Sequence, residues 1–155
     1  MLKFIALLLS LLLGLFSFSA EEPSVPGNEQ QLLADYYEAT VATVGGDHYS
    51  EMVLYRNANG SYEIDLFTKF EDEPEICSVY PADETYYDAI VSVVKENGID
   101  KWNDTKYVAG LTGKEYAFRF YLDGEYYRVT SDNMPDDGLT ALAAIRNVLG
   151  KAFTD

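Results

Sequence analysis

The side chains that most often carry nucleophilic catalysis or bind metals are scarce in this chain. His48 is its only histidine and Cys77 its only cysteine. His48 follows a glycine pair typical of a tight turn, so we expect a solvated imidazole. Cys77 stands in the apolar run Ile76–Val79, which predicts a buried and unreactive thiol. A zinc site of the usual nitrogen and sulfur type needs more such ligands, and no serine has the glycine pattern of a nucleophile elbow.

Carboxylates, in contrast, are abundant, with 26 Asp and Glu residues. A hydrolase built on carboxylates needs two of them across a cleft, one with a raised pKa, so a small carboxylate-based hydrolase is one alternative function. The acidic run Asp132–Gly138 lacks the spacing of a calcium-binding EF-hand loop, because Met134 and Pro135 stand where acids are needed. We interpret it as an acidic helix start and the run Glu71–Glu75 as a solvated turn, with weak calcium binding at either left open. Because phosphate-binding glycine motifs are also missing, the sequence predicts no cofactor and no metal.

The clearest constellation lies on a hairpin. Tyr116–Leu122 and Glu125–Ser131 flank Asp123 and Gly124, a pair that favours a two-residue turn. This turn fixes which residues face each other across the two strands. The predicted pairs are Leu122 with Glu125, Tyr121 with Tyr126, Phe120 with Tyr127, Arg119 with Arg128 and Phe118 with Val129.

Alternation along these strands sends Arg119, Tyr121, Tyr126 and Arg128 to the side opposite the apolar one. We call these four residues the Arg/Tyr ledge. Two arginines that face each other repel, so acids must lie nearby. The acids considered for this role are Glu63, Asp65 and Glu115. The functional interpretation is that the ledge binds an acidic or carbohydrate partner through charge-assisted hydrogen bonds and ring stacking.

The elements that would position this hairpin are predicted from periodicity and turn signals. Asn28 and Gln31 resemble a helix-starting capping box, with Leu32, Leu33 and Tyr36 following at helical spacing, so a short helix is expected there. Strands are expected at 41–44, 49–56, 61–70 and 76–80. A two-residue turn at residues 59–60 would place Arg56 opposite Glu63.

Two amphipathic helices complete the prediction. One begins near Asp83 and ends in a left-handed cap at Asn97 and Gly98, with Trp102 packed beyond it. The other follows Pro135, with apolar positions at Leu139, Leu142, Ile145, Leu149 and Phe153. The fold class is therefore α+β: a single antiparallel sheet of five to six strands with two helices packed on one face. The two halves also share a weak ββα pseudo-repeat.

The N-terminus has the layout of a secretory signal peptide. Lys3 precedes the apolar run 4–16, and small residues follow, which favours cleavage near Ser19 or Ala20. The predicted organisation is a signal peptide at 1–20, a flexible leader at 21–28 and one α+β domain at 29–155. We expect a secreted, extracytoplasmic protein, and the lone Cys77 excludes an intramolecular disulfide and favours bacterial export.

Charge narrows the class of partner. The chain has 11 Lys and Arg against its 26 acids, a net charge of −15, and loss of Lys3 with the signal would make it −16. Such a surface disfavours nucleic acids and anionic membranes. The abundant aromatic residues indicate a folded chain rather than a disordered one. The prediction is an acidic, non-catalytic binding domain for an extracellular protein or carbohydrate. The alternative to this and to the hydrolase is a self-associating envelope component; the oligomeric state stays open.

Overall fold

The structure is a computed structural model that describes residues 30–40, 48–104, 113–131 and 134–154. Six strands, two α-helices and two short 3₁₀ helices form within these ranges. The strands are β1 (Gln31–Thr40), β2 (His48–Arg56), β3 (Tyr62–Phe70), β4 (Ile76–Ala82), β5 (Lys114–Leu122) and β6 (Glu125–Thr130). The helices are α2 (Glu84–Asn97), η1 (Ile99–Asp104), α3 (Gly138–Gly150) and η2 (Lys151–Phe153). No helix in the described ranges is long and apolar enough to cross a membrane.

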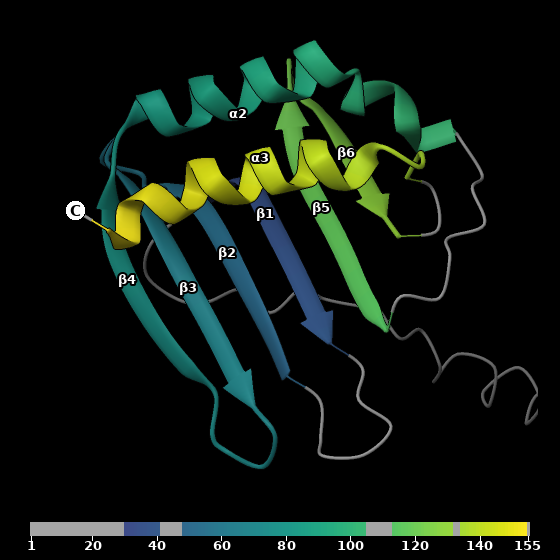
Figure 1. Ribbon diagram of the computed structural model, residues 1–155. Coiled ribbons are helices and arrows are strands. Elements are labelled where there is room, and N and C mark those ends of the chain that lie inside the picture. The colour runs from purple at the N-terminus through teal and green to yellow at the C-terminus, as the bar shows by residue number, and fades with distance from the viewer. Residues whose placement is uncertain (1–29, 41–47, 105–112, 132–133, 155) are drawn as a thin grey trace, which may run out of the picture.

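The six strands form one antiparallel sheet in the order β4-β3-β2-β1-β5-β6. This confirms the α+β class and the single antiparallel sheet. Both helices lie on the same side of the sheet, which leaves its other face without a helix among the described residues (Figure 1). The ββα pseudo-repeat stays a prediction. The buried core joins side chains of the strands and helices, among them Tyr36, Leu54, Ile64, Phe118, Ile90, Val94, Ile145 and Leu149.

The predicted short helix near residue 31 is wrong, because these residues belong to strand β1. β1 is hydrogen-bonded to β2 on one side and to β5 on the other, so it is one of the two central strands of the sheet. Four consecutive residues of β1 are buried: Leu33, Ala34, Asp35 and Tyr36. The segment therefore lacks the alternation of polar and apolar residues that is typical of a strand with one buried face. Strand pairing on both sides outweighs the helical spacing of its leucines.

The β5–β6 hairpin has the predicted register, with Arg119 opposite Arg128. The β2–β3 hairpin differs by one residue, because Arg56 faces Tyr62 and not Glu63. The backbone N–H of Gly60 donates to the carbonyl of Asn57 at 2.8 Å, and Gly60 has a φ of 85°. This is a three-residue turn that ends in a left-handed glycine, and it shifts the register predicted for a two-residue turn. The Arg56 guanidinium lies 5.9 Å from the centre of the Tyr62 ring instead of pairing with a carboxylate.

The ends of α2 follow from capping residues. The Asp83 side chain accepts a hydrogen bond from the Thr85 backbone N–H at 2.9 Å, and Gly98 forms the predicted left-handed cap. Beyond the cap, Trp102 is buried in the core, as expected. Of the apolar positions expected in the last helix, Leu142, Ile145 and Leu149 are buried, whereas Leu139 is 41% exposed. Phe153 lies beyond the end of α3, in η2, and is only partly buried. The predicted strand at 41–44, the signal peptide and the leader lie outside the described residues.

Candidate ligand-binding face

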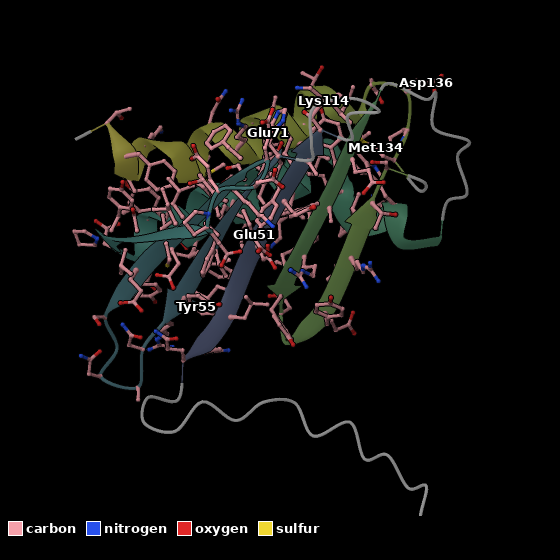
Figure 2. The ribbon with its side chains drawn as sticks, turned by 90° about the horizontal axis from the view of Figure 1, so that it is seen from below. Glu51, Tyr55, Glu71, Lys114, Met134 and Asp136 are labelled. Carbon is pink, nitrogen blue, oxygen red and sulfur yellow. The ribbon has the colours of Figure 1, made fainter. Side chains whose placement is uncertain are left out.

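The face of the sheet turned away from α2 and α3, which we call the open face, carries a row of mixed charges. Residues that face each other across neighbouring strands share a face of the sheet. The β2 side chains Glu51 and Tyr55 lie on the open face (Figure 2), since Met52 and Leu54 between them belong to the core. The central row, one residue from each strand in register, is Val79, Asp65, Val53, Asp35, Arg119 and Arg128.

An ion-pair cluster stands in the middle of this row. Nη2 of Arg119 pairs with Oδ2 of Asp35 on β1 and lies 2.9 Å from Oε1 of Glu51 on β2. The Asp35 side chain is buried, whereas those of Arg119 and Glu51 are 41% and 24% exposed. One guanidinium is therefore shared between a buried carboxyl and a more exposed one.

The surroundings of Asp35 disfavour its ionised form. Burial and then the charge of Glu51 raise the pKa of Asp35 to about 7, although Arg119 acts in the opposite direction. The carboxyl is thus poised to take up or release a proton near neutral pH. Asp65, two strands away in the same row, also has a raised pKa, because of burial and then the charge of Glu63.

Several buried polar atoms of the central row have no hydrogen-bond partner among the described residues. They are Oδ1 of Asp35, Nε of Arg119 and Oδ1 of Asp65. A buried polar atom without a partner costs free energy, so such atoms are uncommon in folded proteins. Two of the three belong to the same ion pair, which therefore keeps hydrogen-bonding capacity that the described chain does not use.

The structure brings the four residues of the Arg/Tyr ledge together on the open face of β5 and β6. Tyr121 and Tyr126 face each other with ring centroids 5.3 Å apart and are 36% and 47% exposed. Arg128 is exposed beside Arg119. The tyrosine pair lies nearer the β5–β6 turn, and the arginine pair occupies the next row of the same face.

Neighbouring strands supply acids to the ledge, as the facing arginines require, but the acids differ from those considered. Asp35 and Glu51 pair with Arg119, in place of Glu63, Asp65 or Glu115. Sequence reasoning missed Asp35 because its segment was interpreted as a helix. The one signal in the sequence is an acid inside the apolar run 32–37.

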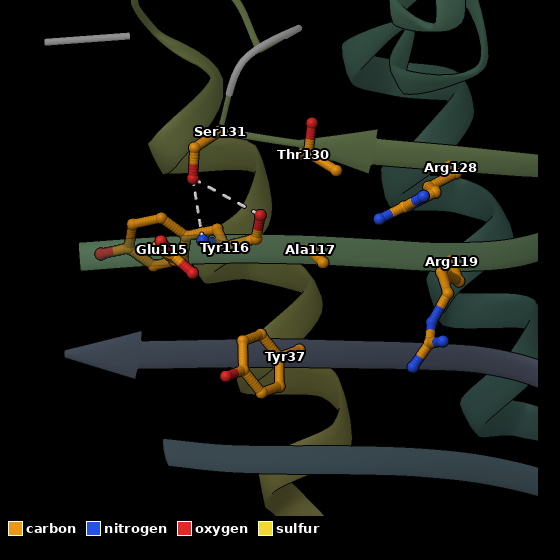
Figure 3. A pocket seen from close by; sticks show the side chains of 8 residues that line it. All are labelled: Tyr37, Glu115, Tyr116, Ala117, Arg119, Arg128, Thr130 and Ser131. Carbon is orange, nitrogen blue, oxygen red and sulfur yellow. Dashed lines mark hydrogen bonds between the residues drawn. The ribbon is translucent and has the colours of Figure 1, made fainter. Parts of the chain in front are cut away.

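A shallow pocket of about 400 Å³ adjoins the arginines. Arg119 reaches from β5 towards β1, and Tyr37 of β1 closes the pocket on that side (Figure 3). Ala117 forms a low floor between Tyr37 and Thr130 in the next row of the sheet. Side chains of both signs, Arg119, Arg128 and Glu115, thus meet the Tyr37 ring around one concavity.

The other groups singled out by type are placed differently. His48 is exposed, as expected, and its ring stacks on Phe70 at 6.0 Å. Cys77 is also exposed, so the prediction of a buried thiol is wrong: its strand, β4, is the edge of the sheet. Burial of the thiol, though slight, and then the charges of Asp65 and Glu75 raise the pKa of Cys77, which disfavours the reactive thiolate. Within the part of the chain that the structure describes, no three His, Cys, Asp or Glu residues gather into a metal-binding group.

The chain matches no protein-family model, and a comparison with curated proteins finds no similar sequence.

Proposed function

We propose that the protein is a non-catalytic, exported binding domain whose Arg/Tyr ledge binds a sugar or similar ring that bears a carboxylate. One observation carries the proposal: two arginines that line a pocket face each other, and an exposed pair of tyrosines stands next to them on the side away from the pocket. Guanidinium groups bind carboxylates through charge-assisted hydrogen bonds, and tyrosine rings offer a flat surface for stacking. No helix in the described ranges covers this face (Figure 1).

The charge of the chain limits the size and charge of the ligand. At a net charge of −15, long-range repulsion acts against any polyanion. A small ligand with a single carboxylate meets little of this repulsion and still benefits from the local guanidinium groups. The proposal therefore favours a monosaccharide or short oligosaccharide with one acidic sugar.

The test uses glucuronate as the probe and glucose as its uncharged counterpart, with binding followed by amide chemical shifts in NMR spectra. Glucuronate should shift signals of β5 and β6 and glucose should bind much more weakly. Arg128→Ser should weaken glucuronate binding about tenfold, the worth of one charge-assisted contact. Arg146→Ser is the matched control, because Arg146 lies on α3 and its side chain is 58% exposed. If Arg128→Ser binds glucuronate as the parent does, the ledge is not the site.

Export is the second part of the proposal, and it is supported by the signal-like sequence of the first twenty residues. Mass spectrometry of the protein recovered from the medium or periplasm of an expressing bacterium tests it. A mass that lacks the first 19 or 20 residues supports export with cleavage. Recovery of the full-length chain from the cytoplasm alone argues against it.

Self-association through the edge of the sheet is a second candidate function, favoured by strand β4. β4 contains no charged residue, and Ile76 and Val79 are 55% and 59% exposed. Uncharged, exposed edge strands tend to pair with a second chain. Sedimentation velocity at increasing concentration should then show a dimer that Val79→Lys abolishes, while Leu139→Lys on α3 leaves it intact. A monomer at all concentrations dismisses this candidate.

A carboxylate-based hydrolase would draw on the raised pKa of Asp35, as a general acid does. Asp35 is only 3% exposed, so a substrate cannot touch its carboxyl without a rearrangement of the sheet face. We therefore favour binding over catalysis for this cluster.

A further inference from the structure

We propose that a carboxylate ligand replaces Asp35 as the partner of Arg119, and that Asp35 takes up a proton from the solvent as the ligand binds. This inference rests on the proposed function and specifies how the same site is regulated. Its basis is the geometry of the cluster, in which Arg119 is shared between Asp35 and Glu51 and is also part of the pocket wall.

Protonation of Asp35 removes one negative charge from the site. With Asp35 ionised, the carboxylates of Asp35, Glu51 and the pocket residue Glu115 outnumber the guanidinium groups of Arg119 and Arg128, so an anion is repelled. With Asp35 protonated, the two signs balance. A ligand carboxylate would then meet less repulsion at Arg119, where otherwise it would be a third carboxylate around this guanidinium group.

Both strands hydrogen-bonded to β1 contribute groups that face Asp35. β2 contributes the Glu51 carboxyl and the Tyr55 hydroxyl, and β5 contributes Arg119. The helices lie on the other side of the sheet (Figure 1). Only Arg119 among these groups favours the ionised carboxyl, so drawing Arg119 away towards a ligand leaves Asp35 with burial and a second carboxyl, both of which favour proton uptake.

Two unpaired atoms make the exchange structurally simple. Nε of Arg119 is buried and has no hydrogen-bond partner among the described residues, so once the side chain turns towards the pocket its N–H can donate to a ligand oxygen without breaking a bond at that atom. Oδ1 of Asp35 is also unpaired and can hold the proton. The exchange thus requires only that the Arg119 side chain turns from Asp35 to the ligand carboxylate, while the backbone stays in place.

Binding of glucuronate to the full-length protein at pH 6 and pH 8 tests the inference, since the sugar carboxylate is ionised at both values. Reciprocal linkage between ligand and proton predicts that glucuronate binds about tenfold more tightly at pH 6. Asp35→Asn should bind with the same affinity at both values, close to that of the parent at pH 6. Asp65→Asn is the matched control, because Asp65 lies in the same row with an unpaired buried oxygen; it should keep the parent's pH dependence.

A second readout needs no variant. The ¹³C shift of the Asp35 carboxyl should move to its protonated value when glucuronate saturates the parent protein at pH 8. Equal affinities at the two pH values, or an unmoved carboxyl signal at saturation, overturn the proton exchange and leave the proposed function standing. If glucuronate binds at neither pH, both the exchange and the proposed function fail.

Discussion

Arg119 of β5 lies directly opposite Asp35 of β1, and their side chains form an ion pair on the open face of the sheet. The pair connects the Arg/Tyr ledge to β1, the strand that lies between the β2–β3 and β5–β6 hairpins. Its two members differ in exposure, since Asp35 is buried and Arg119 lines the pocket. Substitutions on the two sides should therefore have different effects on stability.

Replacing Asp35 with Asn should flatten the pH dependence of stability between about pH 4 and 7. The pKa of Asp35 is about 7 in the folded protein against an ordinary 3.8, so between these two values the folded state holds a proton that the unfolded state has released. The stabilisation is complete below the ordinary pKa and is lost as the pH rises through about 7, by up to about 1.4 kcal/mol per pH unit. Urea unfolding followed by circular dichroism measures it. Asp88→Asn, on the exposed side of α2, should keep the parental slope, and an unchanged slope in Asp35→Asn contradicts the prediction.

Removing Arg119 should cost more stability than removing Arg128. Arg119→Ser leaves two carboxylates close together without their shared cation, and we expect a loss of about 1–3 kcal/mol after allowance for its partial exposure. Arg128→Ser removes an exposed side chain and should change stability by less than about 0.5 kcal/mol. Adding Asp35→Asn to Arg119→Ser should recover part of the loss, which a double-mutant cycle of unfolding free energies measures. Equal losses for the two arginines would show that the cluster does not stabilise the fold.

A side chain at Gly138, the first residue of α3, should destabilise the fold. A Cβ there would overlap Cγ of Met134 and come within 3.1 Å of Cη2 of Trp102. Gly138→Ala should therefore lower the unfolding free energy by about 1–3 kcal/mol. Gly150→Ala, at the other end of the same helix, meets nothing within 4 Å and should be neutral or slightly stabilising. Thermal unfolding of the two variants compares them, and a loss at Gly150 as large as that at Gly138 contradicts the packing argument.

Cys77 should react with a thiol reagent in the folded protein. The residue is exposed on the edge strand, so one equivalent per chain is expected without denaturant. Its raised pKa should make the reaction slower at pH 7.5 than that of a small free thiol. Absorbance of the released thiolate follows the reaction. A reaction that appears only after unfolding would contradict the exposure of this strand.

The parts of the fold set by short-range signals could be predicted from the sequence. The Asp123–Gly124 turn and the alternation beside it were sufficient for the register of β5 and β6, because a two-residue turn leaves one choice of pairing. The ends of α2 near Asp83 and Gly98 were predictable as well, because capping residues act on the adjacent turn of the helix. The exception is the turn before β3, where Gly60 closes a longer loop than the dipeptide indicated.

The parts set by strand order could not be predicted. β1 is buried by β2, which follows it, and by β5, which lies far along the chain, so its own residues carry no alternation to identify it. Because this segment was predicted to be a helix, Asp35 was not among the candidate acids. Similarly, the apolar run around Cys77 is compatible with a central strand, and only the sheet order shows that it is an edge.

The burial of Trp102 has a practical consequence for experiments on this protein. It is the only tryptophan, and it packs in the core next to the start of α3, on the side of the sheet away from the ledge. Its fluorescence emission is therefore an intrinsic reporter of the helical layer. A ligand that occupies the ledge without disturbing that layer should quench tyrosine emission and leave the tryptophan spectrum unchanged.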